Sequence, residues 1–324
     1  MRIDQITPSM RYRNDINSTV WVLQKIIKDI GFESCTLSEP VQAKEKEYII
    51  YHMLPGSQVA KTLSGIESKQ KVLFYHGIMP PEEKLAKVKN RFAITFTTTK
   101  YLEKDLQKAG YGGIKVLPLP VDLRDYEREP DAQLIRTYDD EYTNILFAGQ
   151  ITPNKKLEET ILVFNYYHKK FNPKSRLFLV GSFSADAGYC QKLLDLIKEL
   201  EIKNIFLPGR ANFAQLLAYY RLSHIFLSMS EYEGLPTPLV EAMYLKVPVI
   251  AFGHGAVPEV LGGAGCLIDD KDIRETARLL DLIVKDREKR EKIIRRQSER
   301  VAAFQPEKVF PLYSEAITEA FGCP

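Results

Sequence analysis

The stretch Glu233-Gly234-Leu235-Pro236-Thr237-Pro238-Leu239-Val240-Glu241 joins a glycine-proline turn to the start of a helix and carries a carboxylate at each end. It follows the short apolar run Ile225-Phe226-Leu227. Thr237 is placed to cap the helix, and Pro238 then takes the first helical position, where a missing N–H costs nothing. Free N–H groups and the positive end of the helix dipole form a site for phosphate there. The sequence thus predicts a strand, a turn and a helix with an anion site between them.

Spacing alone leaves two interpretations of these carboxylates open. Acidic residues are common near a helix N-terminus, because the helix dipole favours them. A capping box would place a glutamate three residues after the cap, whereas Glu241 lies four residues after Thr237. The box therefore explains Glu241 poorly, and ligand binding and dipole stabilisation remain as alternatives.

The composition is that of a soluble globular protein of about two domains. Of the 324 residues 45% are apolar and 27% are charged, and the net charge of +3 is too small to indicate nucleic-acid binding. The four cysteines are widely spaced and form no metal-binding or redox pair, which is typical of a reducing compartment. The N-terminus lacks the apolar core of a signal peptide, and no apolar run is long enough to span a bilayer. We expect a cytoplasmic protein, with which peripheral membrane contact is compatible.

Short apolar runs alternate with segments of helical spacing along the whole chain, which predicts an α/β fold with parallel sheets covered on both faces. The runs lie at residues 48–51, 72–75, 93–96, 114–117, 145–148, 177–180, 205–207, 225–227 and 247–250.

The alternation breaks at the proline-rich run 117–120 and the charged stretch that follows it, so we place the domain boundary near residues 122–142. Residues 1–135 and 143–303 would each form a doubly wound, Rossmann-like domain. Residues 306–324 would form a helix that packs back on the first domain. The cleft between the domains is then the expected site, and the boundary segment the expected hinge. The stretch 286–300 mixes both charge signs and is interpreted as a solvated helix face.

Six motifs occur in order in the second half: residues 147–156, 179–182, 207–210, 230–243, 247–251 and 255–259. Together they resemble the retaining nucleotide-sugar glycosyltransferases of family 4, which have the two-domain GT-B fold. The resemblance covers residues 143–270. The first half resembles one branch of that family more loosely, at residues 5–9, 14–15, 75–81 and 97–102.

The resemblance implies a role for each end of the opening stretch. Glu241 would accept hydrogen bonds from the ribose hydroxyls of the donor, because a carboxylate is an acceptor only. Glu233 would face the transferred sugar. The backbone of the segment Gly234, Leu235, Pro236 and Thr237 would contact the diphosphate. An ordinary turn before a helix is the alternative for this segment.

The resemblance also implies a set of diphosphate and base contacts. Lys155 matches the lysine that binds the diphosphate and offsets its developing charge, although by itself Lys155 could be a surface lysine. Gln150 occupies the position where the family usually has arginine, and Lys156 or Arg210 could supply that charge. Arg210 otherwise lines the nucleobase pocket, together with Gly181.

Four residues of the first half are candidates for the reacting sugar or the acceptor. His76 ends a strand where the family places a histidine close to the transferred sugar, and a histidine can pass a proton or donate a hydrogen bond near neutral pH. Hydrogen bonding to a loop explains His76 equally well. His52 is a second cleft candidate. Asn14 and Asp15 would contact diphosphate or acceptor, or else cap the following helix.

The implied reaction moves a sugar from a UDP- or GDP-linked donor to a saccharide or glycolipid hydroxyl, with retention at the anomeric carbon and with no cofactor. No Asp-x-Asp metal motif stands in a suitable loop, so lysine and the helix dipole would replace a metal ion. Two alternatives stay open. One is another reaction on the same fold, such as epimerisation of a sugar nucleotide. The other is a GT-B protein that binds without turnover, which Gln150 and a short first domain would favour.

Overall fold

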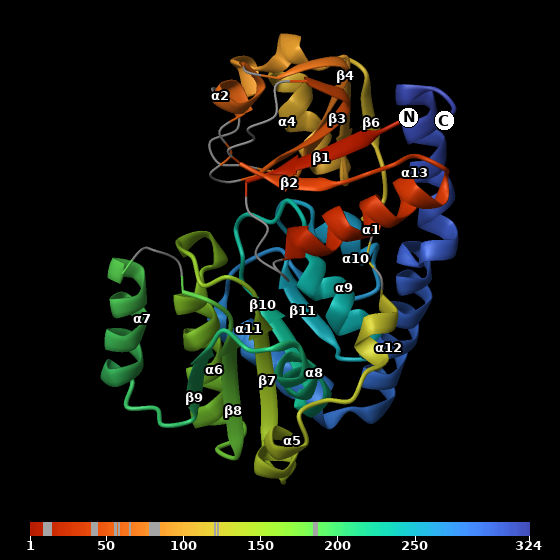
Figure 1. Ribbon diagram of the computed structural model, residues 1–324. Helices are drawn as coiled ribbons and strands as arrows, with labels where there is room; N and C mark the ends of the chain where they lie inside the picture. Colours follow the sequence, from red (N-terminus) through yellow and green to blue (C-terminus); the bar gives the residue numbers. More distant parts are fainter. Residues whose placement is uncertain are drawn as a thin grey trace. The chain divides into compact units, whose positions relative to one another are not determined.

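The computed structural model describes residues 1–8, 15–39, 45–54, 57, 59–64, 66–77, 85–119, 121, 123–183 and 187–324. The chain forms two compact units, each with its own parallel sheet (Figure 1). Unit 1 comprises Met1–Asp122 and Ala303–Pro324, and unit 2 comprises Leu123–Ala302.

Unit 1 is built on a six-stranded parallel sheet of order β2-β1-β3-β4-β5-β6. Its strands are β1 (Ile3–Thr7), β2 (Thr36–Ser38), β3 (Glu45–Met53), β4 (Glu67–Tyr75), β5 (Ile94–Thr97) and β6 (Ile114–Val116). Its helices are α1 (Asp15–Asp29), α2 (Val59–Ser64), α4 (Lys100–Lys108) and α13 (Pro306–Phe321), with a 3-10 turn η1 (Lys89–Arg91). The strand order changes direction at β1, because β2 follows β1 in sequence but β3 lies on its other side.

Helix α13 belongs to unit 1, although it ends the chain. It packs beside α1 (Figure 1). Val309, Tyr313 and Ile317 on α13 share one apolar core with Leu23 and Ile27 on α1. All five are at most 1% exposed, so α13 covers unit 1 with apolar side chains at helical spacing.

Unit 2 is built on a second six-stranded parallel sheet, of order β12-β11-β10-β7-β8-β9. Its strands are β7 (Thr143–Ala148), β8 (Ser175–Val180), β9 (Ile205–Gly209), β10 (Ile225–Ser228), β11 (Val249–Phe252) and β12 (Cys266–Ile268). Its helices are α5 (Ala132–Tyr138), α6 (Leu157–Lys170), α7 (Ala187–Glu199), α8 (Phe213–Leu222), α9 (Thr237–Tyr244), α10 (Val257–Leu261), α11 (Ile273–Lys285) and α12 (Arg287–Val301). Its 3-10 turns are η2 (Leu123–Glu127) and η3 (Pro153–Lys155), and a further turn, η4 (Ala302–Phe304), lies where the chain returns to unit 1. The two sheets confirm the α/β architecture with two doubly wound units that the apolar runs predict.

The charged stretch after the proline-rich run is folded into unit 2, whereas we expected residues up to 135 in the first domain and a linker over 122–142. Its first part is the turn η2, which packs on α9. Its second part is α5, which packs on α8, and the N–H of Asp131 donates to the Ala214 carbonyl at 2.9 Å. Asp131 also caps α5 by accepting from the Leu134 N–H. The charges of this segment mark the solvated side of folded turns rather than an extended linker.

The carboxyl edge of sheet 2 depends on glycines at the ends of three neighbouring strands. Gly149 donates its N–H to the Val180 carbonyl, and Gly181 donates to the Gly209 carbonyl, both at 3.0 Å. A Cβ on Gly181 would lie 1.7 Å from the Gly149 carbonyl oxygen. A side chain at Gly181 therefore cannot fit without parting β7 from β8.

We expect Gly181→Ala to destabilise unit 2 by about 3 kcal/mol or more, because the new methyl group overlaps a backbone atom that cannot rotate away. Denaturant unfolding followed by circular dichroism measures this loss. Gly112→Ala is the matched control, since a Cβ there meets nothing within 4 Å. Equal stability of the two variants would contradict the close approach of β7 and β8.

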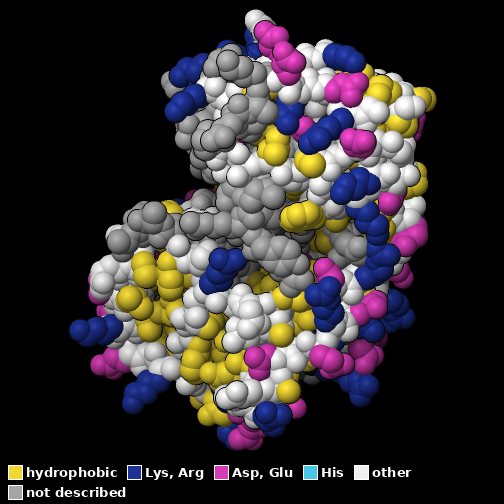
Figure 2. Space-filling model, viewed as in Figure 1, with side chains coloured by type: hydrophobic (Ala, Val, Ile, Leu, Met, Phe, Trp, Pro, Cys, Tyr) yellow, Lys and Arg dark blue, Asp and Glu magenta, His cyan; other side chains and the backbone are white. Residues whose placement is uncertain are grey.

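Helix α12 contains the stretch in which both charge signs alternate. Arg287 pairs with Glu291 and Lys289 with Asp286, and the helix buries only Gln297 and Val301. Figure 2 shows Lys and Arg interleaved with Asp and Glu over the face in view. Among the helices in the described part of the chain, none is long and apolar enough to cross a membrane.

Candidate functional site

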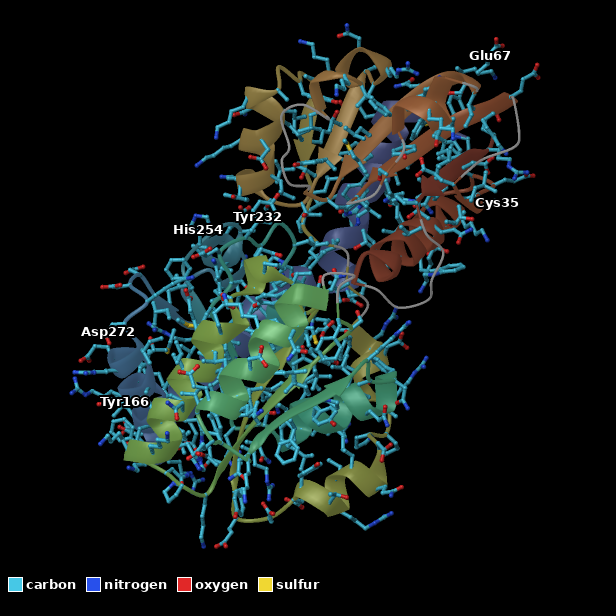
Figure 3. All side chains as sticks on the ribbon, turned by 90° about the vertical axis from the view of Figure 1, so that its left-hand side faces the viewer. Cys35, Glu67, Tyr166, Tyr232, His254 and Asp272 are labelled. Atoms are coloured by element: carbon cyan, nitrogen blue, oxygen red, sulfur yellow. The ribbon has the colours of Figure 1, made fainter. Side chains whose placement is uncertain are left out.

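The turn between β10 and α9 lies where the strand order of sheet 2 changes direction, between β10 and β7. In open α/β sheets this crevice, at the carboxyl ends of the strands, is where ligands bind. Tyr232 in this turn and His254 after β11 lie at the same end of unit 2 (Figure 3). The fold thus places the stretch that the sequence singles out at the expected binding edge of its own unit.

Helix α9 begins one residue earlier than the sequence predicts, because Pro236 is its N-cap and Thr237 its first residue. The Thr237 N–H donates to the Leu235 carbonyl at 2.8 Å, which tightens the turn. Thr237 therefore does not cap the helix with its side chain. Its hydroxyl is buried, at 1% residue exposure, and has no hydrogen-bond partner among the described residues.

Glu233 and Lys155 form an ion pair across the crevice, with 2.7 Å between Oε2 and Nζ. Their side chains are 12% and 18% exposed, so the pair is partly shielded from water. The backbone of Glu233 is fixed from the other side, because its carbonyl accepts from the Ala256 N–H at 2.8 Å. Gly255 has a φ of +65°, and a Cβ there would lie 2.7 Å from the Glu233 carbonyl oxygen. The loop after β11 thus determines where Glu233 stands.

The loops after β7 and β10 are joined by further bonds. The Glu231 N–H donates to the Asn154 carbonyl at 2.9 Å, and Asn154 Nδ2 donates to the Tyr232 carbonyl at 3.3 Å. Glu231 also pairs with Lys271 at 2.9 Å and with Lys156 at 3.0 Å, which hold the pKa of its carboxyl below the ordinary value. The ammonium of Lys156 is therefore directed at Glu231, not at the Lys155–Glu233 pair. Sequence reasoning missed Glu231 and Lys271, whose pairing is distant in sequence.

Glu241 is 5% exposed, and tyrosine hydroxyls reach both of its carboxylate oxygens. Tyr220 on α8 donates to Oε2 at 2.8 Å, and Tyr126 on η2 donates to Oε1. The Tyr126 ring packs edge-on against Phe213, with 5.1 Å between ring centroids. A carboxylate is an acceptor only, with about four lone-pair sites, and each tyrosine hydroxyl takes one of them. Sequence reasoning missed both tyrosines, because nothing local connects them with Glu241.

Gln150, Gly181 and Arg210 lie just beyond three adjacent strands, β7, β8 and β9. The side chains of Gln150 and Arg210 are exposed. These three residues thus share the edge of the sheet that carries the Lys155–Glu233 pair. Asn14 lies outside the described residues. Asp15 is the first residue of α1, but its side chain is not among those that the structure describes.

His52 and His76 meet in the interior of unit 1. His52 Nδ1 and His76 Nε2 are 2.9 Å apart, and His52 Nε2 lies 2.8 Å from Gln5 Oε1. The exposed fractions are 0% for His52 and Gln5 and 4% for His76. Burial lowers the pKa of His76 to about 3, and burial together with the neighbouring His76 lowers the pKa of His52 well below its usual range. Both imidazoles are therefore neutral at physiological pH.

Unit 1 is expected to lose stability as the pH falls below about 6.5. A histidine in the unfolded chain has a pKa near 6.5. Below this pH the unfolded chain therefore binds a proton at residue 76, whereas the buried His76 of the folded protein stays neutral. The stabilisation is fully present above pH 6.5 and falls by about 2 kcal/mol for His76 between pH 6.5 and pH 5.

Urea unfolding followed by the fluorescence of Trp21, the one tryptophan of the sequence, measures this loss because Trp21 lies on α1 of unit 1. His76→Gln should flatten the pH dependence, whereas His168→Gln, on α6 of unit 2, should leave the Trp21 signal unchanged. A His76→Gln profile with the wild-type slope would show that His76 is not buried in neutral form.

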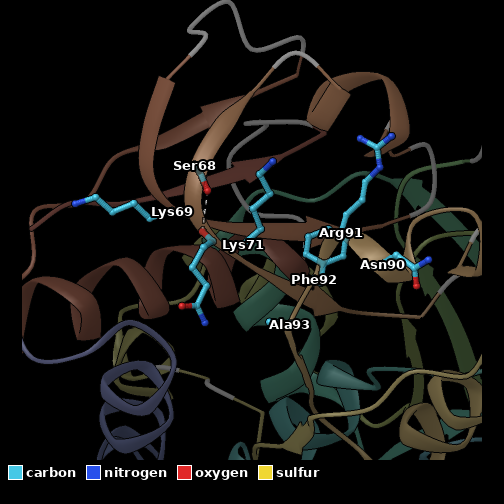
Figure 4. A pocket seen from close by; sticks show the side chains of 8 residues that line it. Ser68, Lys69, Lys71, Asn90, Arg91, Phe92 and Ala93 are labelled. Carbon is cyan, nitrogen blue, oxygen red and sulfur yellow. Dashed lines mark hydrogen bonds between the residues drawn. The ribbon is translucent and has the colours of Figure 1, made fainter.

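A basic pocket of about 510 Å³ lies at the opposite, amino-terminal edge of sheet 1 (Figure 4). Ser68, Lys69 and Lys71 begin its β4 wall, and Arg91 and Phe92 precede β5. Lys69 pairs with Glu47, and Lys71 donates to the Ile66 carbonyl at 2.8 Å. Since ligands of parallel sheets bind at carboxyl ends, this pocket is a weaker candidate than the Glu233 edge.

Comparison with known proteins identifies the second half of the chain. Residues 133–300 match the family model described as glycosyl transferases group 1. N-acetyl-alpha-D-glucosaminyl L-malate synthase of Bacillus anthracis is 28% identical over 200 residues, which cover 60% of this chain and 50% of the relative. The amylovoran biosynthesis glycosyltransferase AmsD of Erwinia amylovora is 24% identical over 177 residues, covering 53% and 47%. The chain spans about half the length of these curated relatives.

Solved structures share the fold over the whole chain. Sucrose-phosphate synthase from Thermosynechococcus elongatus has a TM-score of 0.81 at 16% identity, and the match covers 100% of both chains. HepE from Anabaena, in complex with UDP and glucose, has a TM-score of 0.79 at 14% identity, covering 98% of this chain and 100% of that one. These likenesses confirm the two-domain GT-B fold class.

Proposed function

Because the chain belongs to the glycosyl transferases group 1 family, we propose that it moves a sugar from a nucleoside-diphosphate sugar to an acceptor hydroxyl. The observation that carries this proposal is the shielded Lys155–Glu233 pair beside the segment that leads into α9. Lysine and a helix N-terminus both attract a diphosphate. The pair thus offers one group for the diphosphate and one for the sugar attached to it.

In the proposed donor complex, the diphosphate takes the place of the Glu233 carboxylate at Lys155. The backbone at the start of α9, from Gly234 to Thr237, contacts the diphosphate, and Glu241 accepts from the ribose hydroxyls. Lys155 offsets the charge that develops on the leaving diphosphate, which is the electrostatic stabilisation that most speeds such reactions. Arg210 and Gly181 line the base, and Gln150 donates a neutral hydrogen bond.

The proposed chemistry is that of a retaining enzyme of family 4. The bond between the anomeric carbon and the diphosphate oxygen breaks, and a bond to the acceptor oxygen forms on the same face of the sugar. The acceptor proton passes to the leaving phosphate. His76 contacts a substrate hydroxyl from unit 1. Lysine and the α9 N-terminus serve where other enzymes use a metal ion, so the proposal includes no cofactor.

The names of the relatives support a saccharide acceptor. AmsD is a biosynthetic enzyme for amylovoran, and HepE was solved with UDP and glucose. We therefore propose a UDP- or GDP-linked donor and a saccharide or glycolipid acceptor in polysaccharide or glycoconjugate assembly. The proposed location is the cytoplasm, with peripheral contact at a membrane for a lipid-linked acceptor.

Product analysis tests this function. The protein is incubated with UDP-, GDP- and ADP-sugars, with and without an extract of lipid-linked and free saccharides. Release of nucleotide only in the presence of acceptor, together with a new glycoside, is the expected result. A changed sugar nucleotide without acceptor would instead indicate an epimerase. Donor binding without turnover on any extract would indicate the inactive binding protein, for which the neutral Gln150 is the specific observation.

A further inference from the structure

Three buried side chains of unit 1 form one continuous hydrogen-bonded chain, from Gln5 on β1 through His52 on β3 to His76 after β4. Phe74 closes one side of it, with its ring stacked on His76 at 4.4 Å between centroids. The β3–β4 register places His52 directly opposite Phe74. These three hydrogen-bonded side chains therefore lie in a buried, apolar setting at the carboxyl end of sheet 1. In such a setting each hydrogen bond needs a definite donor and a definite acceptor.

The backbone carbonyl of Val20 sets the direction of every bond in this chain. Gln5 Nε2 donates to that carbonyl at 3.1 Å, because a carbonyl oxygen can only accept. The amide oxygen of Gln5 then faces His52, so His52 Nε2 must carry a hydrogen. A reversed amide would bring two oxygens together at the same 3.1 Å contact.

The direction passes from His52 to His76. Neutral His52 carries its hydrogen on Nε2, so its Nδ1 has a lone pair and can only accept. His76 Nε2, 2.9 Å from this Nδ1, must therefore carry a hydrogen and donate it. His76 is then protonated on Nε2 and leaves a lone pair on Nδ1. This nitrogen is buried and has no hydrogen-bond partner among the described residues. A buried acceptor without a hydrogen-bond donor destabilises the folded protein. Such acceptors are rare in folded proteins unless a ligand or a water molecule donates to them.

We propose that Gln5 and His52 are positioning residues, which hold His76 in the Nε2–H form so that Nδ1 accepts a hydrogen bond from a substrate hydroxyl. The inference rests on the proposed sugar transfer, and it gives His76 the role of an acceptor toward that hydroxyl rather than a donor. Gln5 and His52 act only through His76. The sequence names His52 only as a cleft candidate, and neither the motifs nor the comparisons give Gln5 or His52 a role in orienting His76.

Nitrogen NMR of histidine-labelled protein tests the chain directly, because protonated and unprotonated ring nitrogens resonate far apart. His76→Gln assigns the signals. Wild-type His76 should show a protonated Nε2 and an unprotonated Nδ1 at neutral pH. His52→Leu removes the nitrogen that accepts from His76 Nε2, so His76 should no longer be held in the Nε2-protonated form. In His52→Gln the amide oxygen can accept instead, and His76 should again be protonated on Nε2. His254→Gln, on unit 2, is the control that should change nothing at His76.

Activity supplies the second readout. With saturating donor, His52→Leu and Gln5→Leu should lower kcat roughly 10- to 100-fold, by analogy with the loss when the hydrogen-bond partner of a metal-binding histidine is removed. The stabilisation by nucleoside diphosphate should remain at the wild-type value, and His52→Gln should recover most of kcat. A sugar donor should also shift the His76 Nδ1 signal.

The outcomes separate this inference from the proposed function. If the wild type transfers sugar but His76 Nδ1 is protonated, or if kcat survives in His52→Leu, the inference is overturned and the function stands. If the wild type neither transfers sugar nor shifts the Nδ1 signal with any donor, both are overturned. Loss of nucleotide stabilisation in His52→Leu would also overturn it, because the defect would then be structural.

Discussion

Lys155→Ala is expected to lower kcat by about 100- to 1,000-fold, the loss typical when one preorganised group that stabilises developing charge is removed. The ammonium of Lys155 is the cation that contacts Glu233, at 2.7 Å, and in the proposed reaction it receives the leaving diphosphate. The KM for the donor should rise less than kcat falls, since the charge on the bridging oxygen grows only as the bond breaks. Steady-state kinetics with the sugar nucleotide that serves as donor in the product analysis measure both constants.

Two further variants make this result specific. Lys155→Arg keeps the charge and should retain far more activity than Lys155→Ala. Lys192→Ala removes a 60% exposed lysine that pairs with Glu158 elsewhere in unit 2, and it should leave kcat unchanged. Lys155→Ala also leaves Glu233 without its ion-pair partner, so thermal unfolding is needed to show that the variant keeps its stability. Full activity of a folded Lys155→Ala protein would contradict the assigned role.

Glu241→Gln is expected to weaken binding of the nucleoside diphosphate by roughly 10- to 100-fold, since hydrogen bonds to a charged group contribute about 1.5–3 kcal/mol. The change keeps the size of the side chain but replaces a four-site acceptor with an amide that also donates. It therefore removes ribose contacts and conflicts with the hydroxyls of Tyr126 and Tyr220. Isothermal titration calorimetry measures the loss.

Matched variants separate the ribose contact from the tyrosine contacts. Tyr126→Phe removes one hydroxyl from Glu241 and frees a lone pair for the ligand, so binding should be kept or strengthened. Glu275→Gln, an exposed residue of α11 that pairs with Arg278, should have no effect. If Glu241→Gln bound nucleotide as tightly as the wild type, Glu241 would be a structural acceptor for the tyrosines only.

The sequence predicts well the strands that are apolar and buried on both faces. No apolar run corresponds to β1, which carries Asp4 and Gln5, or to the part-exposed edge strands β2 and β12. Runs such as 145–148 and 225–227 are apolar at every position, and the structure has them as β7 (Thr143–Ala148) and β10 (Ile225–Ser228), with every residue buried. This pattern depends only on residue type and needs no knowledge of partners. The same holds for α13, whose apolar positions repeat at helical spacing.

The site could be predicted only in part, because its contacts join residues that are distant in sequence. Glu233 and Glu241 are found from the turn between them, but Tyr126 and Tyr220 reach Glu241 from 115 and 21 residues away. The Gln5–His52 bond likewise spans 47 residues. Local patterns also misplace the helix start, since Thr237 has the composition of a cap but the turn at Pro236 takes that position.

We propose that the edge of unit 2 around Glu233, Lys155 and Glu241 binds a nucleoside diphosphate. The most direct measurement is the Tm of the wild-type protein with UDP, GDP or ADP over a range of concentrations, because a ligand that binds only the folded state raises Tm by mass action. We predict that at least one of the three raises Tm in proportion to the logarithm of its concentration and that Glu241→Gln reduces this shift. If none of the three shifted Tm, this edge would not be a site for these nucleoside diphosphates.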